Sequence, residues 1–185
     1  MRRLLLLVAT LFLIQPAQAQ ENNAALHQLF DQQWQRGLRD YPENAVFYGD
    51  NRYNDRWTDM SLGAIAVREA GDREALQSLR AIDRTQLSAA DQLNYDTFEW
   101  QLKQSIARQA FREYLMPISH QGGVQTADGL LELLAFNTEK DYRDWLARLN
   151  ALPALIDQNI VLLREGAKLG MTPPKAIMKR VPNQI

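Results

Sequence analysis

Apolar residues recur three and four positions apart along most of this chain, which is the spacing that lines one side of an α-helix. No segment alternates apolar and polar residues for long enough to predict a strand, and the most strand-like piece, residues 45–48, is only four residues long. The spacing therefore predicts an all-α fold, built as an irregular array of several helices. The clearest stripe consists of Leu152, Leu155, Ile156, Ile160, Leu163 and Ala167.

Capping and helix-stopping residues divide the chain into predicted segments. Ser88 with Asp91, and Thr138 with Asp141, each place a hydroxyl at a helix start and a carboxylate three residues later, which resembles a capping box. Pro153 is expected in the first turn of the last long helix, where a proline is tolerated. The predicted helices cover residues 23–41, 42–48, 62–82, 89–111, 130–136, 139–149 and 152–167.

Three of these segments carry more specific expectations. The helix after Ser88 has apolar residues on more than one face, so we expect it to pack centrally with partners on two sides. Thr126 or Asp128 is expected to cap residues 130–136. Gly170 is expected to end the last long helix.

Two irregular stretches interrupt the helical pattern, residues 49–60 and residues 116–125. The first is rich in Asn and Asp, but its acids do not match the ligand positions of a calcium-binding EF-hand loop. The second contains the pair Gly122-Gly123, which allows backbone angles that other residues resist. We expect both stretches to be loops.

The first residues are typical of a secretory signal peptide, predicted over residues 1–19. Two arginines open the chain, residues 4–14 are apolar apart from one threonine, and small residues allow cleavage between Ala19 and Gln20. An uncleaved N-terminal anchor is the alternative. The chain has no cysteine, so neither lipid attachment behind the signal nor a disulfide is expected. We expect an exported protein, periplasmic or secreted, with a mature region over residues 20–185 and no membrane contact after cleavage.

The charge balance and the last residues bear on the partners of the chain. With 21 Lys and Arg against 22 Asp and Glu, the chain lacks the basic excess of a nucleic-acid-binding protein. After Pro173-Pro174, residues 176–181 begin a further apolar segment that the remaining residues do not complete. We therefore expect the N-terminal portion of a larger, mostly helical protein, with the missing C-terminal part as its partner. A naturally frayed terminus is the alternative.

The sequence offers few residues for chemistry. It contains two histidines, His27 and His120, and lacks the His-Glu-x-x-His helix that holds zinc in many peptidases. Ser119 precedes His120, but no nucleophile-elbow motif surrounds it. No catalytic residue and no metal ligand is therefore assigned. Because function often gathers in glycine-rich loops, His120, Gly122 and Gly123 are the candidate substrate-binding residues.

Aromatic side chains offer a second place for a ligand, since they could line a groove for a sugar or a peptide. Most of them fall on helical stripes, so packing in the core is the preferred interpretation. The side chains concerned are Trp34, Tyr41, Trp57, Trp100, Tyr142 and Trp145.

Three segments together resemble the bacterial domain-of-unknown-function 885 family, over residues from about 24 to the end. They are Tyr41-Pro-Glu-Asn-Ala-Val-Phe-Tyr-Gly49, Leu115-Met-Pro-Ile-Ser-His-Gln-Gly-Gly-Val124, and residues 141–174 with the element Arg-Glu-Gly-x-x-x-Gly-x-Thr-Pro-Pro from Arg164 to Pro174. The family is mostly helical, often exported, and grouped with zinc metallopeptidases because of a downstream His-Glu helix.

The resemblance implies a zinc-dependent, peptidase-like hydrolase whose catalytic motif lies outside this chain. The fragment would then supply walls and a substrate-facing lid from its two loops, with a peptide as substrate. The alternative is a non-catalytic periplasmic helical module that binds a partner or a peptide. A third hypothesis, hydrolysis by Ser119 and His120 alone, is not expected to hold.

Overall fold

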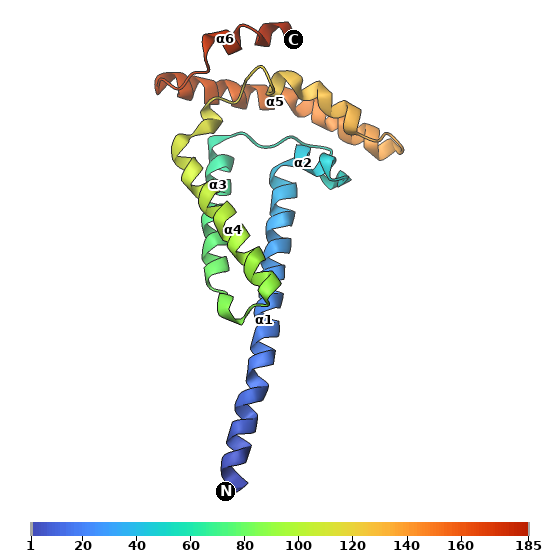
Figure 1. Cartoon of the computed structure of the whole chain (residues 1–185). Helices are drawn as coiled ribbons and strands as arrows, with labels where there is room; N and C mark the ends of the chain where they lie inside the picture. The colour runs from blue at the N-terminus through green and yellow to red at the C-terminus, as the bar shows by residue number, and fades with distance from the viewer. Residues whose placement is uncertain (1, 185) are drawn as a thin grey trace. The chain divides into compact units, whose positions relative to one another are not determined.

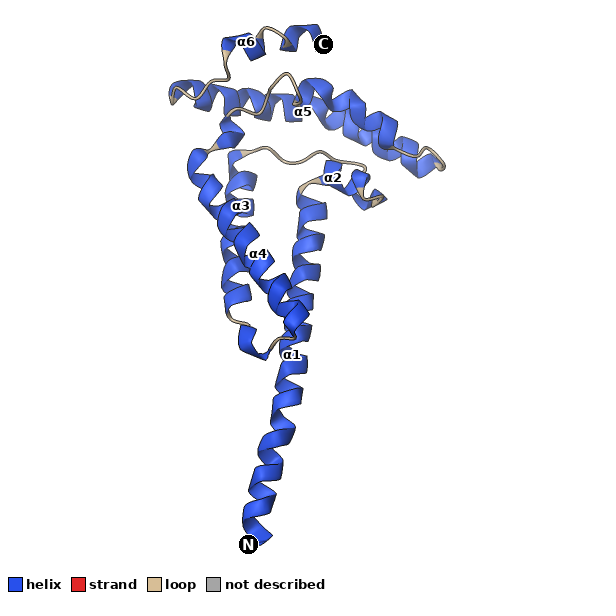
Figure 2. Cartoon of the chain, viewed as in Figure 1, coloured by secondary structure: helices blue, strands red, loops and turns tan. Residues whose placement is uncertain are grey.

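The structure is a computed structural model, with the backbone described for residues 2–184 and the side chains for residues 21–184. Within residues 2–184 every regular element is a helix, and the only extended pairing there is an isolated bridge between Ser119 and Gly122. Figure 2 shows these helices joined by loops. The predicted all-α fold class is confirmed.

The order of the elements follows the colour ramp of Figure 1. The α-helices are α1 (Arg2–Asp40), α2 (Pro42–Phe47), α3 (Leu62–Arg80), α4 (Ala89–Arg108), α5 (Glu139–Lys168) and α6 (Lys175–Met178). Short 3₁₀ helices lie between and after them: η1 (Asn51–Tyr53), η2 (Arg84–Gln86), η3 (Gln109–Phe111), η4 (Glu113–Leu115), η5 (Val124–Leu133) and η6 (Val181–Gln184).

The predicted signal peptide, residues 1–19 with cleavage between Ala19 and Gln20, lies outside the residues whose side chains are described. Among the residues whose side chains are described, none of the helices combines the length and the apolar character needed to cross a membrane.

The chain forms two compact units. Unit 1 contains the chain up to Gln35 together with Glu69–Ala107, and unit 2 contains Arg36–Arg68 together with the chain from Arg108 onward. Helices α1 and α3 therefore contribute residues to both units. Each unit has its own cluster of buried apolar side chains.

In unit 1, helices α1, α3 and α4 share one apolar core. The rings of Phe30 and Phe98 meet edge-on in it, with their centroids 5.2 Å apart. Burial of each large apolar side chain in such a core contributes about 1.5–3 kcal/mol relative to exposure. The buried members are Leu26, Leu29, Ala75, Leu79, Leu87, Tyr95 and Leu102.

Helix α4 packs on one side only, so the expectation of partners on two sides is wrong. Tyr95 and Leu102 are buried, whereas Leu93 and Trp100 are 67% and 62% exposed. Leu93 and Trp100 each stand two positions before a buried residue, and two positions turn a helix by about 200°. Their side chains therefore lie opposite the side that meets the core.

The predicted cap of α4 is confirmed. The backbone N–H of Asp91 donates to Ser88 Oγ at 3.1 Å, and the Asp91 carboxylate lies 3.0 Å from His27 Nε2. Burial alone would raise the pKa of Asp91, but hydrogen bonds from Asn94, His27 and Ser88 outweigh it and lower that pKa. The carboxylate thus links α1 to the start of α4.

Helix α5 is one continuous helix, which corrects the prediction of two helices with Pro153 in the first turn of the second. The capping box of Thr138 and Asp141 is confirmed at its start, and Pro153 lies in its interior. A proline inside a helix costs about 3 kcal/mol. Buried residues on both sides of Pro153 fall on a single face, so packing of that face offsets the cost: Arg148, Leu155, Asn159, Leu162 and Gly166.

The end of α5 depends on two glycines. The N–H of Met171 donates to Gly166 O at 2.8 Å and that of Gly170 donates to Ala167 O at 3.2 Å, the pattern of a Schellman motif. Gly170 has φ +70°, so the prediction that it ends the helix is confirmed. A Cβ on Gly166 would lie 2.6 Å from Leu115 O. Gly166 therefore lets α5 approach the backbone of η4.

The predicted α-helix over residues 130–136, capped by Thr126 or Asp128, is wrong. The 3₁₀ helix η5 occupies Val124–Leu133 instead, and Thr126 inside it has non-helical angles of φ −112° and ψ 22°. The Thr126 hydroxyl donates to Gly123 O at 3.0 Å rather than accepting from a helix start. With its side chain used there, Thr126 cannot nucleate an α-helix.

A second apolar side of α5 is exposed. The predicted stripe of this helix is therefore only partly correct, since Leu155 is buried while Ile156 and Ile160 are 39% and 38% exposed. Spacings of four and three residues place the exposed members on one line. They are Tyr142, Leu146, Leu149, Ile156 and Ile160.

We expect Gly166→Ala to destabilise the protein by about 1–3 kcal/mol, because the new methyl group would force η4 away from α5. Urea unfolding at constant pH measures the change. Gly37→Ala is the matched control, since a Cβ there meets no atom within 4 Å, and it should raise stability by up to about 1 kcal/mol. Equal stability of both variants would contradict the close-approach role of Gly166.

The exposed side of α5 should bind an apolar dye and promote self-association. The double variant Leu146→Glu/Ile156→Glu should lower dye fluorescence and shift the protein towards monomer in sedimentation experiments. Asn150→Glu adds charge at an exposed polar position of the same helix and should change neither. Unchanged dye binding in the double variant would exclude this side as the dye site.

Candidate functional site

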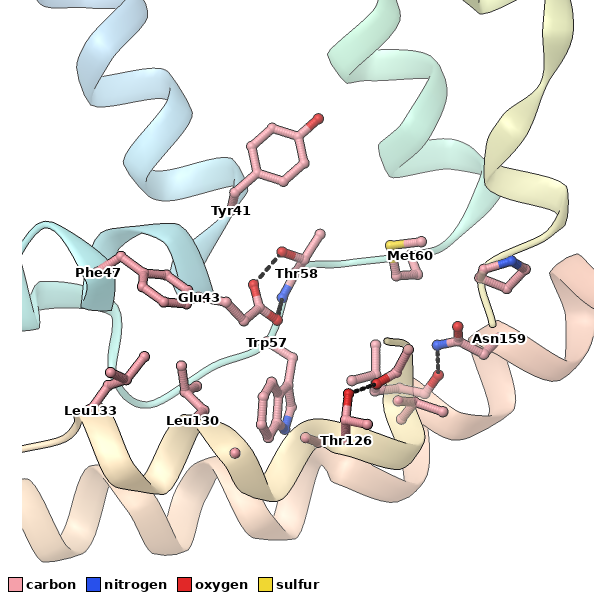
Figure 3. A pocket seen from close by; sticks show the side chains of 16 residues that line it. Tyr41, Glu43, Phe47, Trp57, Thr58, Met60, Thr126, Leu130, Leu133 and Asn159 are labelled. Carbon is pink, nitrogen blue, oxygen red and sulfur yellow. Dashed lines mark hydrogen bonds between the residues drawn. The ribbon is translucent and has the colours of Figure 1, made fainter. Parts of the chain in front are cut away.

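Unit 2 contains a largely apolar pocket of about 490 Å³, which we call the Trp57 pocket. Figure 3 shows its walls, which come from α2, η5, α5 and the chain before α3. Both irregular stretches of the sequence contribute to it, through Trp57, Thr58 and Met60 on one side and Pro117 and Gly123 on the other. Its large apolar lining residues are Tyr41, Phe47, Trp57, Met60, Leu130, Leu133 and Leu155.

Two polar side chains of the pocket are held in fixed positions. The Glu43 carboxylate accepts the backbone N–H of Thr58 at 3.0 Å and also the Thr58 hydroxyl. Asn159 is buried, and its amide N–H donates to Leu155 O at 2.8 Å, one turn back along α5. Figure 3 shows both groups facing the pocket between its apolar walls. The pocket therefore offers oxygen acceptors within an apolar surface.

The Trp57 side chain is fixed from several directions. Its indole N–H donates to Arg148 O at 2.7 Å, and the guanidinium carbon of Arg148 lies 5.0 Å from the ring centroid. The ring of Trp145 meets that of Trp57 at an interplanar angle of 67°. A side chain held in this way loses little further freedom when a ligand binds, which favours affinity.

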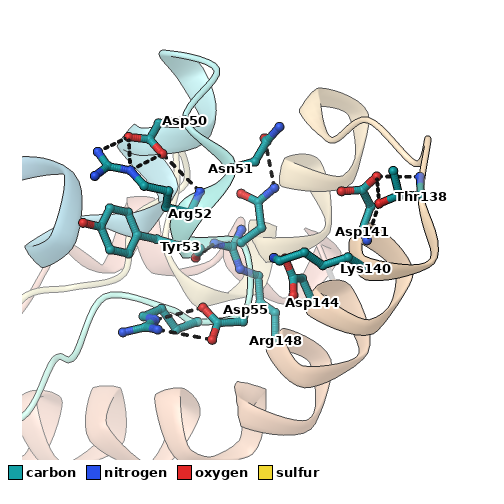
Figure 4. A network of polar contacts seen from close by, with 12 residues as sticks. Asp50, Asn51, Arg52, Tyr53, Asp55, Thr138, Lys140, Asp141, Asp144 and Arg148 are labelled. Carbon is teal, nitrogen blue, oxygen red and sulfur yellow. Dashed lines mark hydrogen bonds and ion pairs between the residues drawn. The ribbon is translucent and has the colours of Figure 1, made fainter.

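Arg148 is the fully buried residue behind this wall. Its Nη2 donates to Tyr53 O at 2.9 Å, and Figure 4 shows it near Asp55 and Asp144. Burial lowers the pKa of Arg148, while the charges of Glu43, Asp55 and Asp144 act in the opposite direction. An arginine stays protonated at neutral pH, so a permanent positive charge lies beneath the loop.

The acids of the loop 49–60 have partners of their own. Arg52 Nε donates to Asp50 at 2.9 Å, and Arg56 Nε donates to Asp55 at 2.9 Å. These hydrogen bonds lower the pKa values of Asp50 and Asp55, and Figure 4 shows both pairs. Across residues 21–184 no group of three or more His, Cys, Asp or Glu side chains is arranged to hold a metal ion.

The candidate residues from the sequence occupy a tight turn. Ser119 and Gly122 pair across it, with His120 between them, and His120 O accepts from Gln184 Nε2 at 2.8 Å. Gly123 lines the Trp57 pocket, whereas His120 and Gly122 are not among its lining residues. In the described part of the chain, no hydrogen bond joins the Ser119 hydroxyl to the His120 imidazole.

Gly123 allows the chain to pass close to its neighbours at this wall. It has φ +146°, and a Cβ there would lie 2.5 Å from Gln125 Oε1 and 3.1 Å from Pro117 O. Any larger residue would have to displace Gln125 or the backbone of residue 117. The glycine therefore sets the shape of the wall.

Sequence reasoning missed Glu43, Thr58 and Asn159. The contact of Glu43 with Thr58 joins residues 15 positions apart, and Asn159 reaches the pocket only through the packing of α5. The preference for core packing of the aromatic residues is also wrong for several of them. Trp34, Tyr41, Trp100 and Tyr142 are each more than two-fifths exposed, and Tyr41 and Trp57 line the pocket. The density of aromatic residues around Pro42 was the available signal.

Comparison with known proteins identifies the family. The model for the family described as "Bacterial protein of unknown function (DUF885)" matches residues 42–185, so the match begins later than the residue 24 expected from the resemblance. The sequence matches no curated protein and no solved structure. Because the family model covers more than half of the chain, this chain belongs to the DUF885 family of bacterial proteins.

Proposed function

We propose that the chain binds the apolar part of a peptide-like ligand in the Trp57 pocket. In this proposal it serves as the substrate-binding portion of an exported, peptidase-like hydrolase. The single observation that carries the proposal is the pocket itself, about 490 Å³ in volume and lined largely by apolar side chains. Its size and lining suit an organic side chain, since ligand sites are concave, mostly apolar and provided with a few fixed polar groups.

The contacts of the lining side chains support ligand binding rather than catalysis in this pocket. Trp57 is held by Arg148 and Trp145, and the Glu43 oxygens are both engaged by Thr58. A general base needs a proton to abstract and a nucleophile needs an adjacent base. The Trp57 pocket lines up no such pair, so a recognition role fits it best.

The zinc that the family resemblance implies finds no matching set of ligands among these residues. His27 faces Asp91 in unit 1, while His120 lies in the turn of unit 2. Zinc sites in hydrolases require three protein ligands around one ion, and no such group exists in the described side chains. We therefore derive no catalytic step through zinc, and the proposal assigns catalytic groups to a further part of the same polypeptide.

The alternative function is a non-catalytic periplasmic module, and the same pocket favours it equally. Mass spectrometry of peptides incubated with the full-length protein separates the two. Peptide fragments that appear only with the protein support the hydrolase. Peptides that bind and remain intact support the module.

We expect Trp57→Ala to weaken binding of short Leu- or Phe-containing peptides about tenfold, which corresponds to about 1.4 kcal/mol of lost contact. Isothermal titration calorimetry measures the dissociation constants. Leu133→Asn, at a wall position that is 47% exposed, should weaken binding without disturbing the core and without adding a charge to the pocket.

Trp100→Ala is the matched control for Trp57→Ala, because Trp100 is exposed in unit 1 and does not line the pocket. The dissociation constant of the Trp100→Ala variant for these peptides should equal that of the parent protein. Circular dichroism of each variant checks that the helices are intact. If folded Trp57→Ala and Leu133→Asn both bind the peptides as the parent does, the Trp57 pocket is not the binding site.

A further inference from the structure

The Trp57 pocket carries one charge. Glu43 is the only charged residue among its lining residues. It lies in the first turn of α2, directly after Pro42, and is half-buried. The walls around it are mostly apolar, so the field of this carboxylate is less screened than that of a carboxylate in open water.

No basic side chain in the described residues forms an ion pair with Glu43. Its only hydrogen-bond partner there is Thr58, which donates through its backbone N–H and its hydroxyl. An ionised carboxylate has about four acceptor positions, so two bonds leave part of its capacity open. The buried cation Arg148, whose pKa the charge of Glu43 raises against the effect of burial, lies on the Trp57 ring and donates to Tyr53 O. It is not a lining residue.

Aromatic rings surround the same region of the pocket. Figure 3 shows Tyr41, Phe47 and Trp57 arranged around Glu43. The faces of aromatic rings attract cations, and the attraction grows when water is excluded. The Glu43 carboxylate accepts hydrogen bonds at this wall, and no Lys or Arg is among the lining residues to repel a cation. A carboxylate with aromatic neighbours is complementary to a ligand that is both apolar and positively charged.

We propose that the Trp57 pocket selects ligands that present a protonated primary amine beside an apolar side chain, with Glu43 as the counter-ion. The free N-terminus of a peptide with an apolar first residue has this chemistry, and so has a lysine side chain next to an apolar residue. This proposal rests on the proposed function, because it names the ligand class of the same pocket. An ammonium group carries three N–H donors, and the Glu43 carboxylate has acceptor positions that Thr58 does not use.

Three small probes test the proposal by calorimetry: leucyl-alanine amide, N-acetyl-leucyl-alanine amide and N-acetyl-leucyl-lysine amide. The free-amine probe should bind the parent protein about tenfold more tightly than its N-acetyl form, since charge-assisted hydrogen bonds are the stronger ones. If N-acetyl-leucyl-lysine amide binds more tightly than N-acetyl-leucyl-alanine amide, the pocket accepts the amine of a lysine side chain. Tighter binding of the free-amine probe alone identifies the N-terminus.

Glu43→Gln should abolish the preference, so that the free-amine and N-acetyl probes bind this variant with equal affinity, because glutamine retains the shape and an acceptor for Thr58 but not the charge. Glu132→Gln, the same change of charge at an exposed residue of η5 outside the pocket lining, should keep the preference. Salt provides a measurement that needs no variant. Raising the ionic strength should weaken binding of the free-amine probe and leave that of the N-acetyl probe unaffected.

The failures of the two proposals are distinguishable. If folded Glu43→Gln keeps the preference for the amine, or if the parent protein binds the free-amine and N-acetyl probes equally, the role of Glu43 is overturned while the pocket remains a ligand site. If Leu133→Asn leaves the binding of every probe unchanged, the pocket is not the ligand site and both proposals fail.

Discussion

The attachment of the loop 49–60 to α5 is the contact on which the rest of unit 2 depends. This loop has no long regular element of its own, so its backbone groups need partners from elsewhere. Arg148 holds one backbone group and one side chain of the loop, because its guanidinium donates to Tyr53 O and its carbonyl accepts the indole N–H of Trp57. Gln158 adds a third contact by accepting the N–H of Met60 at 2.8 Å. The burial of a guanidinium is unfavourable by itself. The bond to Tyr53 O and the Trp57 ring act against that cost, whereas the buried Nε and Nη1 of Arg148 have no hydrogen-bond partner in the described residues. One wall of the pocket therefore exists because a cation is buried behind it.

The most specific part of the family pattern has a physical explanation in the same helix. In the element from Arg164 to Pro174, Gly166 permits the approach of the Leu115 backbone, and Gly170 provides the positive φ that ends α5. The two prolines after it prevent the helix from continuing. None of these residues touches the pocket directly, since neither glycine is among its lining residues. They fix where α5 stops and how closely it lies against η4, and this places Leu155 and Asn159 at the pocket. The motif is therefore architectural, and it acts on the site through position.

The sequence allowed the prediction of features that depend on neighbouring residues. The caps at Ser88 and Thr138, the helix end at Gly170 and the all-α class are all determined within a few residues, and all are confirmed. Predictions failed where distant contacts compete with local preference. Pro153 indicated a helix boundary, but the buried face that runs from Arg148 to Gly166 keeps α5 continuous. The contact of Glu43 with Thr58 spans a loop, and that of Trp57 with Arg148 joins residues 91 positions apart, so neither left a local signal. Gly123 was identified as a site candidate for its flexibility, whereas its place in the pocket wall depends on its closeness to Gln125 and Pro117.

Helix α5 has apolar residues on two sides, and the two sides differ in physical character. On the buried side, the apolar residues Leu155 and Leu162 alternate with Arg148 and Asn159, polar groups that bind the backbone of a loop or of the helix itself. On the exposed side the apolar residues Tyr142, Leu146, Leu149, Ile156 and Ile160 lie along one line of the helix. A ligand site needs the first arrangement, because fixed polar groups give direction to an otherwise non-directional hydrophobic contact. The exposed side of α5 provides apolar contact area but no fixed polar group that would orient a ligand. The Trp57 pocket, where the Glu43 carboxylate lies among apolar walls, is therefore the proposed recognition site.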